Sequence, residues 1–430
     1  MGLILAGERS SVGKTTVTLA ILAALTAQGE KVQSFKVGPD YLDPLWHRWI
    51  TQRPCPNLDV LLTSPAYVQR CYAYHTRDAS YALVEGVMGL FDGPSSTADI
   101  ARLLNLPVVL VVDCQRLAGS VAAVVHGYRS WDPAVSIAGV VLNRVAGDRH
   151  SQLLRQALEP LGVPILGECR RWDALHRPER HLGLVTPLEA ADLTPWRAAL
   201  VHCGQTCFDW DRLRPLLQVS PRGLSHPPWP TLHCQKPVTL AIARDAAFCF
   251  YYDDGLALLQ AAGVTLRFWS PLQDGPLPPD VHGLLLGGGY PELYAQALSS
   301  QRDVCCDLRR RIAQGLPVYG ECGGLMVLGQ SLTDLSGRTW PMVGALPITT
   351  AMTQRLTLGY RRVPVNRDTC FVSRGETLVG HEFHYSQVTG GTAEPCYGHA
   401  TLHASYLHCH WGGCPTQVQR FLDRVQQYAP

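Results

Sequence analysis

The strongest constraint on the fold is a series of short, almost wholly apolar runs that end at glycine or at a polar residue. In the first half of the chain these runs cover residues 3–7, 32–37, 81–84, 108–112 and 137–142. Continuous apolar runs are typical of parallel strands buried on both faces, with helices in the stretches between them. The sequence therefore predicts an α/β fold with a parallel sheet, and ligands are expected at the carboxyl ends of its strands.

The same pattern stops and then starts again in the second half. Residues 221–237 are proline-rich and lack periodicity, which indicates a connection between domains. Further strands are expected over residues 238–243, 265–269, 283–286 and 316–319, and helices over 252–262, 304–313 and 415–428. We therefore expect a first domain over residues 1–200, a linker over 201–236 and a second α/β domain over 237–430.

Composition argues against several classes of protein. The formal net charge of +2 gives no electrostatic reason to expect a nucleic acid or a membrane as partner. No apolar run approaches the ~18 residues of a membrane-spanning helix, and residues 2–7 are too short for the core of a signal peptide. The 15 cysteines are scattered over a long chain, which favours reduced thiols in a cytoplasmic enzyme over a disulfide scaffold.

The first apolar run leads into a glycine-rich loop, GERSSVGKTT, over residues 7–16. Between a strand and a helix, such a loop offers backbone N–H groups to phosphates, its lysine neutralises charge and its hydroxyl binds Mg²⁺. Five residues separate its two glycines, one more than usual. The side chains and glycines expected to bind ATP are Gly7, Ser10, Gly13, Lys14, Thr15, Thr16 and Lys36.

Two segments that follow the next strands are expected to complete this site: KVGPDYLDP over residues 36–44 and EGVMGLFDG over 85–93. Because Mg²⁺ prefers oxygen ligands, the expected ligands are Thr15, Asp40 and Glu85, although a strand-end carboxylate is also an ordinary cap or turn residue. Asn143 either contacts the adenine of ATP or forms a turn. Candidates for contacts with the substrate or the transferred group are Asp43, Asp92 and Ser96.

A second candidate site lies at Cys322, in the segment YGECGG over residues 319–324. A strand–turn–helix elbow would expose this thiol at a helix N-terminus, which favours a nucleophilic thiolate. The glycine-rich loop at 287–289 follows another strand, and backbone N–H groups there and after the elbow are expected to contact the substrate and to form an oxyanion hole. The expected positions are Gly288, Gly289 and Gly323.

The base for this thiol is expected to be a histidine distant in sequence. Two segments offer candidates, GHEFHYS over residues 380–386 and YLHCH over 406–410. Neither has the spacing of a common zinc motif, so zinc is not expected, and a structural or substrate-shaping role is expected for His381 and His384.

These motifs resemble known families. The YGECGG elbow and the GGGYPE loop are similar to class I glutamine amidotransferases, and the N-terminal half resembles dethiobiotin-synthetase-like ATPases, which share the longer loop spacing. Their combination resembles the cobyrinic acid a,c-diamide synthase family of cobalamin biosynthesis almost from end to end, through strings such as KVGPDYLDP, EGVMGLFDG and GHEFHYS. The resemblance implies a P-loop NTPase sheet domain followed by a flavodoxin-like class I glutamine amidotransferase domain.

The resemblance also implies a reaction. Cys322 would attack the side-chain amide of glutamine, with His408 as its histidine partner, and release ammonia. Many class I members place a glutamate two residues after that histidine, but His410 stands there, so a Cys–His dyad is one alternative for this site. In the first domain, ATP with Mg²⁺ would phosphorylate a carboxylate, and ammonia from glutamine or from solution would displace the phosphate.

The expected substrate is cobyrinic acid, amidated on its a and c acetate groups by a carbon–nitrogen ligase. Alternatives are the same chemistry on hydrogenobyrinic acid or nickel-sirohydrochlorin, the amidation of four other side chains by a cobyric acid synthase, and a non-catalytic, nucleotide-gated binding protein. The partners expected are cobyrinic acid, L-glutamine and ATP, and a homodimer is left open.

Overall fold

The computed structural model describes residues 1–175, 179–180, 183–189, 192–220 and 226–430. The chain divides into two compact units. Unit 1 comprises Met1–Val60 and Ser64–Pro228, and unit 2 comprises Leu61–Thr63 and Trp229–Pro430. Across the described ranges, helices long and apolar enough to cross a membrane are absent.

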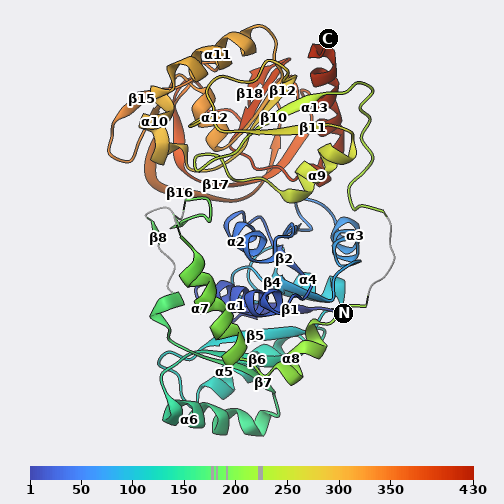
Figure 1. Ribbon diagram of the computed structural model, residues 1–430, viewed down its shortest axis with the longest axis vertical. Coiled ribbons are helices and arrows are strands. Elements are labelled where there is room, and N and C mark those ends of the chain that lie inside the picture. The colour runs from blue at the N-terminus through green and yellow to red at the C-terminus, as the bar shows by residue number, and fades with distance from the viewer. Residues whose placement is uncertain (176–178, 181–182, 190–191, 221–225) are drawn as a thin grey trace. The chain divides into compact units, whose positions relative to one another are not determined.

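Unit 1 is built on a seven-stranded sheet with the strand order β3-β2-β4-β1-β5-β6-β7, in which every neighbouring pair is parallel (Figure 1). The strands are β1 (Leu3–Gly7), β2 (Val32–Val37), β3 (Asn57–Leu58), β4 (Tyr81–Glu85), β5 (Val108–Asp113), β6 (Ile137–Val145) and β7 (Ile165–Arg170). A short antiparallel pair, β8 (Glu179–Arg180) and β9 (Gly183–Leu184), lies outside this sheet.

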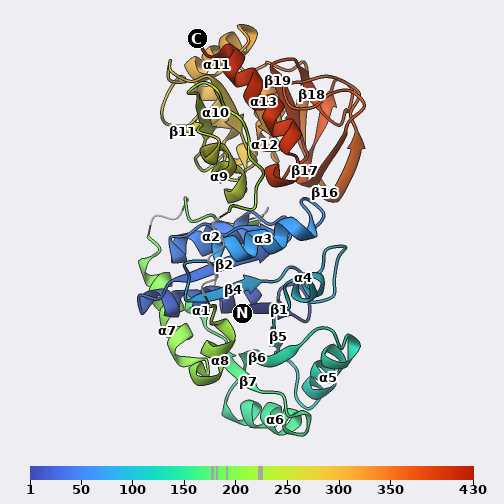
Figure 2. The same cartoon turned by 90° about the vertical axis from the view of Figure 1, so that its right-hand side faces the viewer.

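Helices cover both faces of this sheet. They are α1 (Lys14–Ala27), α2 (Leu42–Thr51), α3 (Pro65–His75), α4 (Thr97–Leu104), α5 (Val121–Trp131), α6 (Asp148–Leu158), α7 (Thr194–Thr206) and α8 (Trp210–Leu217), with short 3-10 turns η1 (Glu159–Leu161) and η2 (Asp173–Leu175). Figure 2 shows α7 and α8 on one side of the sheet and α4 and α5 on the other. Leu3 and Leu5 pack against α1, α7 and α8, and the intervening Ile4 is also buried. Burial on both faces explains why most of these strands are continuous apolar runs, whereas β2 also buries the polar residues Gln33, Ser34 and Lys36.

The expected linker over residues 201–236 differs from the structure. Helix α7 continues to Thr206 and α8 occupies Trp210–Leu217, and buried side chains such as Leu213 and Leu217 join the core of unit 1. The division between the units falls at Pro228 and Trp229, and residues 221–225 of the expected linker lie outside the described residues. Buried leucines of α7 and α8 anchor this segment in the core. The prolines that follow it in the sequence had suggested an irregular connection.

Unit 2 contains a six-stranded sheet in the order β11-β10-β12-β13-β19-β18, parallel except for its last pair. Its strands are β10 (Thr239–Ala243), β11 (Thr265–Trp269), β12 (Gly283–Leu286), β13 (Val318–Glu321), β18 (Tyr397–His399) and β19 (Leu402–Ser405). Alternate residues of β10 enter two different cores: Ala241 and Ala243 pack with α10, α11 and α12, whereas Leu240 and Ile242 pack with α9 and α13. This alternation places helices on both faces of the sheet.

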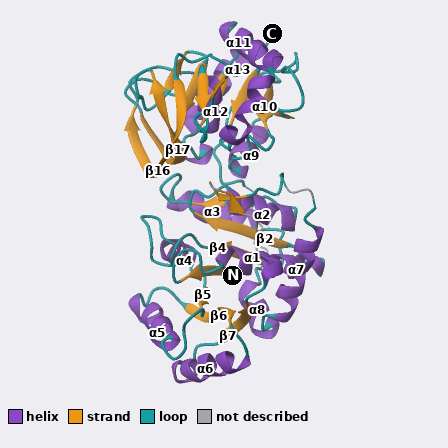
Figure 3. Cartoon of the chain, turned by 90° about the vertical axis from the view of Figure 1, so that its left-hand side faces the viewer, coloured by secondary structure: helices purple, strands orange, loops and turns teal. Residues whose placement is uncertain are grey.

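The helices of unit 2 are α9 (Asp253–Ala261), α10 (Ala295–Ser300), α11 (Arg302–Ala313), α12 (Gly323–Leu328) and α13 (Pro415–Tyr428), with 3-10 turns η3 (Pro291–Tyr294) and η4 (Trp411–Gly413). A second sheet, ordered β15-β14-β16-β17, contains the long strands visible in Figure 3. Its strands are β14 (Ser331–Thr333), β15 (Thr339–Pro341), β16 (Thr349–Pro364) and β17 (Thr377–Gly390). The predicted fold class, two α/β units each built on a parallel or largely parallel sheet, is confirmed.

The core beneath the phosphate loop gives a test of this architecture. Ile21 of α1 is fully buried in the core of unit 1, whereas Leu153 of α6 is largely exposed. We expect Ile21→Ala to lower the free energy of unfolding of unit 1 by about 2–5 kcal/mol, because it leaves a cavity. Leu153→Ala should change it by less than about 0.5 kcal/mol. Urea unfolding followed by circular dichroism measures both, and equal losses would contradict the packing described.

Candidate active sites

The glycine-rich loop joins β1 to α1 at the carboxyl edge of the first sheet. It passes through left-handed backbone at Ser11, with φ 62°, and at Gly13, with φ 92°, before α1 begins at Lys14. A Cβ atom at Gly13 would lie 2.3 Å from Nδ2 of Asn143, so both the backbone conformation and the space require glycine. The loop and the N-terminus of α1 together form an anion-binding site.

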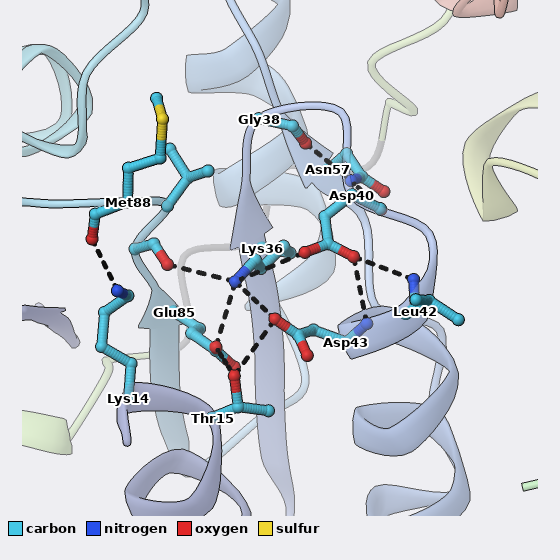
Figure 4. Close-up of polar contacts among 12 residues, drawn as sticks. Lys14, Thr15, Lys36, Gly38, Asp40, Leu42, Asp43, Asn57, Glu85 and Met88 are labelled. Atoms are coloured by element: carbon cyan, nitrogen blue, oxygen red, sulfur yellow. Dashed lines mark hydrogen bonds and ion pairs between the residues drawn. The ribbon is translucent and has the colours of Figure 1, made fainter. Parts of the chain in front are cut away.

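Lys14 is held across this loop. Its Nζ donates a hydrogen bond to the carbonyl oxygen of Met88 at 2.5 Å (Figure 4). It donates another to the carbonyl oxygen of Arg9 at 3.2 Å. Burial and the charge of Lys36 lower the pKa of Lys14 to about 8. A bound phosphate would favour the charged form of this amine, so the position suits an anionic ligand.

Thr15, the next residue of α1, lies beside two carboxylates (Figure 4). Its Oγ1 is 2.6 Å from Oε1 of Glu85 and 3.2 Å from Oδ2 of Asp43. The Nζ of Lys36 contacts the same two carboxylates, at 3.0 Å and 2.7 Å. A hydroxyl and two carboxylates in one small space form an oxygen-rich group that fits Mg²⁺.

Glu85 is fully buried, yet it remains ionised. Burial alone would raise its pKa, but the charge of Lys36 and the hydrogen bond from His47 hold the pKa well below its usual range. The Nε2 of His47 lies 2.6 Å from Oε2 of Glu85, and Cys55 Sγ lies 3.3 Å from the other ring nitrogen. Sequence reasoning missed His47 and Cys55, since neither belongs to a motif with a recognised spacing.

Asp40, expected as a metal ligand, lies at the edge of this group. Its Oδ1 accepts hydrogen bonds from the backbone N–H groups of Leu42, at 2.8 Å, and Asp43, at 3.1 Å, at the start of α2. Its Oδ2 is 3.8 Å from Nζ of Lys36. Asn57, also missed from the sequence, donates to the carbonyls of Gly38 and Asp40, both at 2.7 Å, and so fixes the intervening turn.

Three other predicted residues have local structural contacts. Ser96 caps α4 in a reciprocal capping box with Asp99. Asp92 accepts a hydrogen bond from the backbone N–H of Gly89 at 3.0 Å. Asn143 donates its amide to the carbonyl of Val12 at 2.7 Å, so its side chain braces the phosphate loop. In the loop, Ser10 is exposed and Thr16 is half-buried.

A hollow of about 380 Å³ adjoins the start of the loop. Its lining includes Glu8, Arg9, Asp113, Gln115, Leu117 and Tyr128. Arg9 and Arg144 both pair with Oδ2 of Asp113, at 3.0 Å and 2.8 Å, which fixes the end of β5 beside β1. The hollow therefore extends the site along the carboxyl edge of the sheet.

The second candidate site, in unit 2, centres on the turn between β13 and α12. Cys322 has φ 49° and ψ −98°, a strained conformation for a residue with a side chain. Its backbone N–H donates to the carbonyl of Ser405 at 2.8 Å, which ties the turn to the end of β19. The predicted elbow is present, and it places the thiol at the N-terminus of α12.

His408 lies against this thiol and forms a hydrogen bond with it. The backbone of His408 pairs with that of His381, through N–O distances of 2.8 Å and 3.0 Å, which fixes the histidine next to β17. The Nδ1 of His408 is 2.7 Å from Oε1 of Glu321, the residue that precedes Cys322. Glu321 thus occupies the place of a third triad member. His410 instead accepts from the backbone N–H of Gly412 at 3.2 Å.

Charges in this site favour protonated His408. Burial would lower its pKa, but the nearby sulfur of Cys322 and the carboxylate of Glu321 raise the pKa well above its ordinary value. Glu321 is itself held by the hydroxyl of Tyr319, at 2.7 Å, and the backbone N–H of Cys409, at 3.2 Å. This arrangement can support a thiolate–imidazolium pair.

The glycine loop after β12 approaches the elbow closely. A Cβ atom at Gly288 would lie 2.6 Å from Cε1 of His408, and one at Gly323 would lie 3.3 Å from the backbone N of Gly289. The three predicted glycines therefore border the thiol and the imidazole, with backbone close enough to contact a small substrate.

Of the other two histidines, His381 supplies the backbone pairing described above. The ring of His384 stacks on that of Tyr406, with a centroid separation of 3.9 Å, and its Nδ1 lies 2.8 Å from the carbonyl of Ser386. Burial lowers the pKa of His384 to about 4, so it is neutral at physiological pH. Both histidines shape the wall around His408.

Two families match this chain in consecutive segments. Residues 3–185 match the CobQ/CobB/MinD/ParA nucleotide binding domain, and residues 239–414 match the CobB/CobQ-like glutamine amidotransferase domain. The first segment holds the phosphate loop with its carboxylates, and the second holds Cys322, His408 and Glu321.

Relatives match over almost the whole length. The chain is 49% identical to a cobyrinate a,c-diamide synthase of a Synechococcus species, over 99% of both proteins, and 49% identical to that of a Synechocystis species, over 98% of this chain and 92% of the relative. It is 39% identical to a hydrogenobyrinate a,c-diamide synthase of Streptomyces coelicolor, over 99% of this chain and 97% of the relative. From its phosphate loop to its cysteine elbow, this chain belongs to the cobyrinate a,c-diamide synthase family.

Proposed function

We propose that this chain catalyses the ATP-dependent amidation of the a and c acetate groups of cobyrinic acid, with glutamine as nitrogen donor. The observation that carries the proposal is the presence of two separate sites in one chain. One is a phosphate loop with oxygen ligands, and the other is a thiol–imidazole–carboxylate group. Full-length relatives named as cobyrinate a,c-diamide synthases support the substrate.

In unit 2, the sulfur of Cys322 attacks the side-chain amide carbon of glutamine. Backbone N–H groups near Gly289 and Gly323 stabilise the oxyanion, and protonated His408 gives its proton to the departing ammonia. Water, activated by the now neutral His408, hydrolyses the thioester to glutamate. Glu321 keeps the imidazole oriented, since its Oε1 lies 2.7 Å from Nδ1 of His408.

In unit 1, a carboxylate oxygen of the substrate attacks the γ-phosphorus of ATP, and ADP leaves. Ammonia then attacks the acyl carbon of the acyl phosphate and displaces inorganic phosphate, and the cycle repeats at the second acetate. Lys14 and the loop N–H groups hold the triphosphate in line and offset its charge, which is the main source of rate in phosphoryl transfer.

Mg²⁺ would be held in this site by Thr15, Asp43 and Glu85. Carboxylate oxygens of Asp43 and Glu85 lie within 3.2 Å of Thr15 Oγ1, and Glu85 is ionised. An ion held by these residues would offset the negative charge that develops on the phosphates. Asp40 supports this group from outside it. Its Oδ1 accepts a backbone hydrogen bond at the start of α2, and its Oδ2 faces Lys36.

A second candidate substrate is hydrogenobyrinic acid, the cobalt-free macrocycle. It is favoured by the relative from Streptomyces coelicolor, which carries the name of that activity at 39% identity. Both substrates require the same two sites. Purified protein offered each macrocycle in turn, with ATP, Mg²⁺ and glutamine, will show by its relative kcat/KM which one it prefers.

Replacement of the thiol should separate the two half-reactions. Cys322→Ala is expected to lower glutamine-dependent amidation by about 10³-fold or more, since the nucleophile is lost. Amidation with added ammonium chloride should be retained, because the ATP site is intact. Cys306→Ala, at an exposed position on α11, is the matched control and should leave both rates unchanged. Loss of both activities in a folded Cys322→Ala protein would argue against two separable sites.

Replacement of the loop lysine should have the opposite signature. Lys14→Ala is expected to reduce amidation from glutamine and from ammonium alike, by at least about 10²-fold, because a cation that stabilises the phosphates is removed. Lys31→Ala, at an exposed position before β2, is the control. Product formation, measured by mass spectrometry, tests this, and normal turnover of Lys14→Ala would refute the assignment of the ATP site.

The role of Glu321 predicts a change in pH dependence. Glu321→Gln removes a carboxylate that raises the pKa of His408, so that pKa should fall. If protonated His408 is the acid for ammonia release, activity is lost as the pH rises through this pKa. The alkaline limb of the glutaminase kcat/KM profile should therefore move to lower pH in Glu321→Gln. The control Glu376→Gln, which loses an ion pair with Arg420, should leave the limb in place. An unshifted limb in Glu321→Gln would contradict the role assigned to this glutamate.

A further inference from the structure

Three cysteines that neither active site uses come together at one edge of unit 1. Cys169 is the penultimate residue of β7, Cys203 lies in the last turn of α7, and Cys207 follows that helix directly. Their sulfur atoms all lie within 4.8 Å of one another, and those of Cys203 and Cys207 are 3.8 Å apart. All three are reduced thiols.

The backbone brings these residues together. After α7 the chain pairs with the edge strand β7: the N–H of Glu168 donates to the carbonyl of Cys207 at 2.8 Å, and that of Asp209 donates to Leu166 at 3.0 Å. Gly167 allows this approach, because a Cβ atom there would lie 2.6 Å from the ring of Phe208. Cys203 and Cys207 are four residues apart, which puts them on one side of the helix end.

The separations suit a tetrahedral thiolate site. With Zn–S bonds of about 2.3 Å, two ligands of a tetrahedral Zn²⁺ ion lie about 3.8 Å apart. Cys203 and Cys207 already have this separation, and bringing the third sulfur to it requires a movement of at most about 1 Å. Small rotations about the side-chain bonds can supply that movement.

The burial of the cluster also suits a bound metal ion. Cys169 and Cys203 are buried, whereas Cys207 is half-buried. Three neighbouring thiols at the rim of a core offer both a soft ligand set and a path for an ion.

We propose that Cys169, Cys203 and Cys207 form a Zn²⁺ site that fastens the end of α7 to the edge strand β7. Binding forms three Zn–S bonds, the three thiol protons pass to solvent, and water completes the tetrahedron at the open side of Cys207. None of the three cysteines contributes to the phosphate-loop or thiol sites described above, so the site acts on stability. It ties down the end of α7, which packs on α1, and the start of the segment that leads to α8.

The test uses the full-length protein, reduced and treated with a chelator, then titrated with Co²⁺. One ion should bind per chain and give sulfur-to-cobalt absorption in the near ultraviolet with intense tetrahedral bands in the visible, and one equivalent of Zn²⁺ should abolish both. Cys203→Ser and Cys169→Ser should lose these bands, whereas Cys306→Ser, exposed on α11, should keep them. Zn²⁺ should raise the unfolding midpoint of the wild-type protein and of Cys306→Ser alone.

Three results would overturn the proposal. The first is the absence of tetrahedral cobalt bands in the folded wild-type protein, which would make the cluster a group of core thiols. The second is binding that survives in Cys203→Ser, which would place the ion elsewhere. The third concerns alkylation by iodoacetamide, mapped by peptide mass spectrometry in the wild-type protein. This measurement does not depend on whether a variant folds. Zn²⁺ should protect Cys207 but not Cys306, and equal labelling of Cys207 with and without Zn²⁺ would exclude the site.

Discussion

Both candidate sites depend on one constraint: a helix follows a parallel strand after a short connection, so the chain must turn sharply at the carboxyl edge of the sheet. In unit 1 the turn requires left-handed backbone at Gly13, and in unit 2 it imposes φ 49° on Cys322. Each turn aims a helix N-terminus at the place where negative charge is expected, on phosphates in one unit and on a thiolate in the other. The surrounding residues hold these turns, through Asn143 in one case and the backbone of Ser405 in the other.

Compensated buried charge is the second common feature. Glu85 and Lys36 are both almost inaccessible, yet each faces partners of opposite charge, and Glu321 holds His408 in the same way. Buried charges are tolerated when they are paired and hydrogen-bonded, and loss of one partner leaves an expensive uncompensated charge. The two sites are therefore rigid groups, already arranged before substrate arrives, which suits chemistry that depends on orientation.

Much of this arrangement follows from the sequence. The parallel strands, the phosphate loop and the elbow were indicated by apolar runs and glycine positions. The pairing of Cys322 with His408 was implied only by the family resemblance, because the residues alone left four histidines open. Glu321 was missed for a physical reason. Adjacent residues of a strand point to opposite faces, so Glu321, which precedes Cys322, was not expected to contact the same imidazole as the thiol. The unusual backbone at Cys322 breaks that alternation, so Glu321 and the sulfur reach the same imidazole. Likewise, sequence spacing did not show that Asp43, rather than Asp40, lies beside Thr15. Their positions depend on how α2 begins, where Asp40 accepts a hydrogen bond from the backbone N–H of Asp43.

In the proposed function, ammonia made at Cys322 is consumed at the phosphate loop of the same chain. Mass spectrometry can follow this transfer in the product formed from cobyrinic acid, ATP, Mg²⁺ and glutamine labelled with ¹⁵N in its side-chain amide. We expect a diamide that carries ¹⁵N at both the a and c positions, formed only when ATP is present. A product without label, or labelled glutamine hydrolysed with no amide formed on either macrocycle, would contradict it.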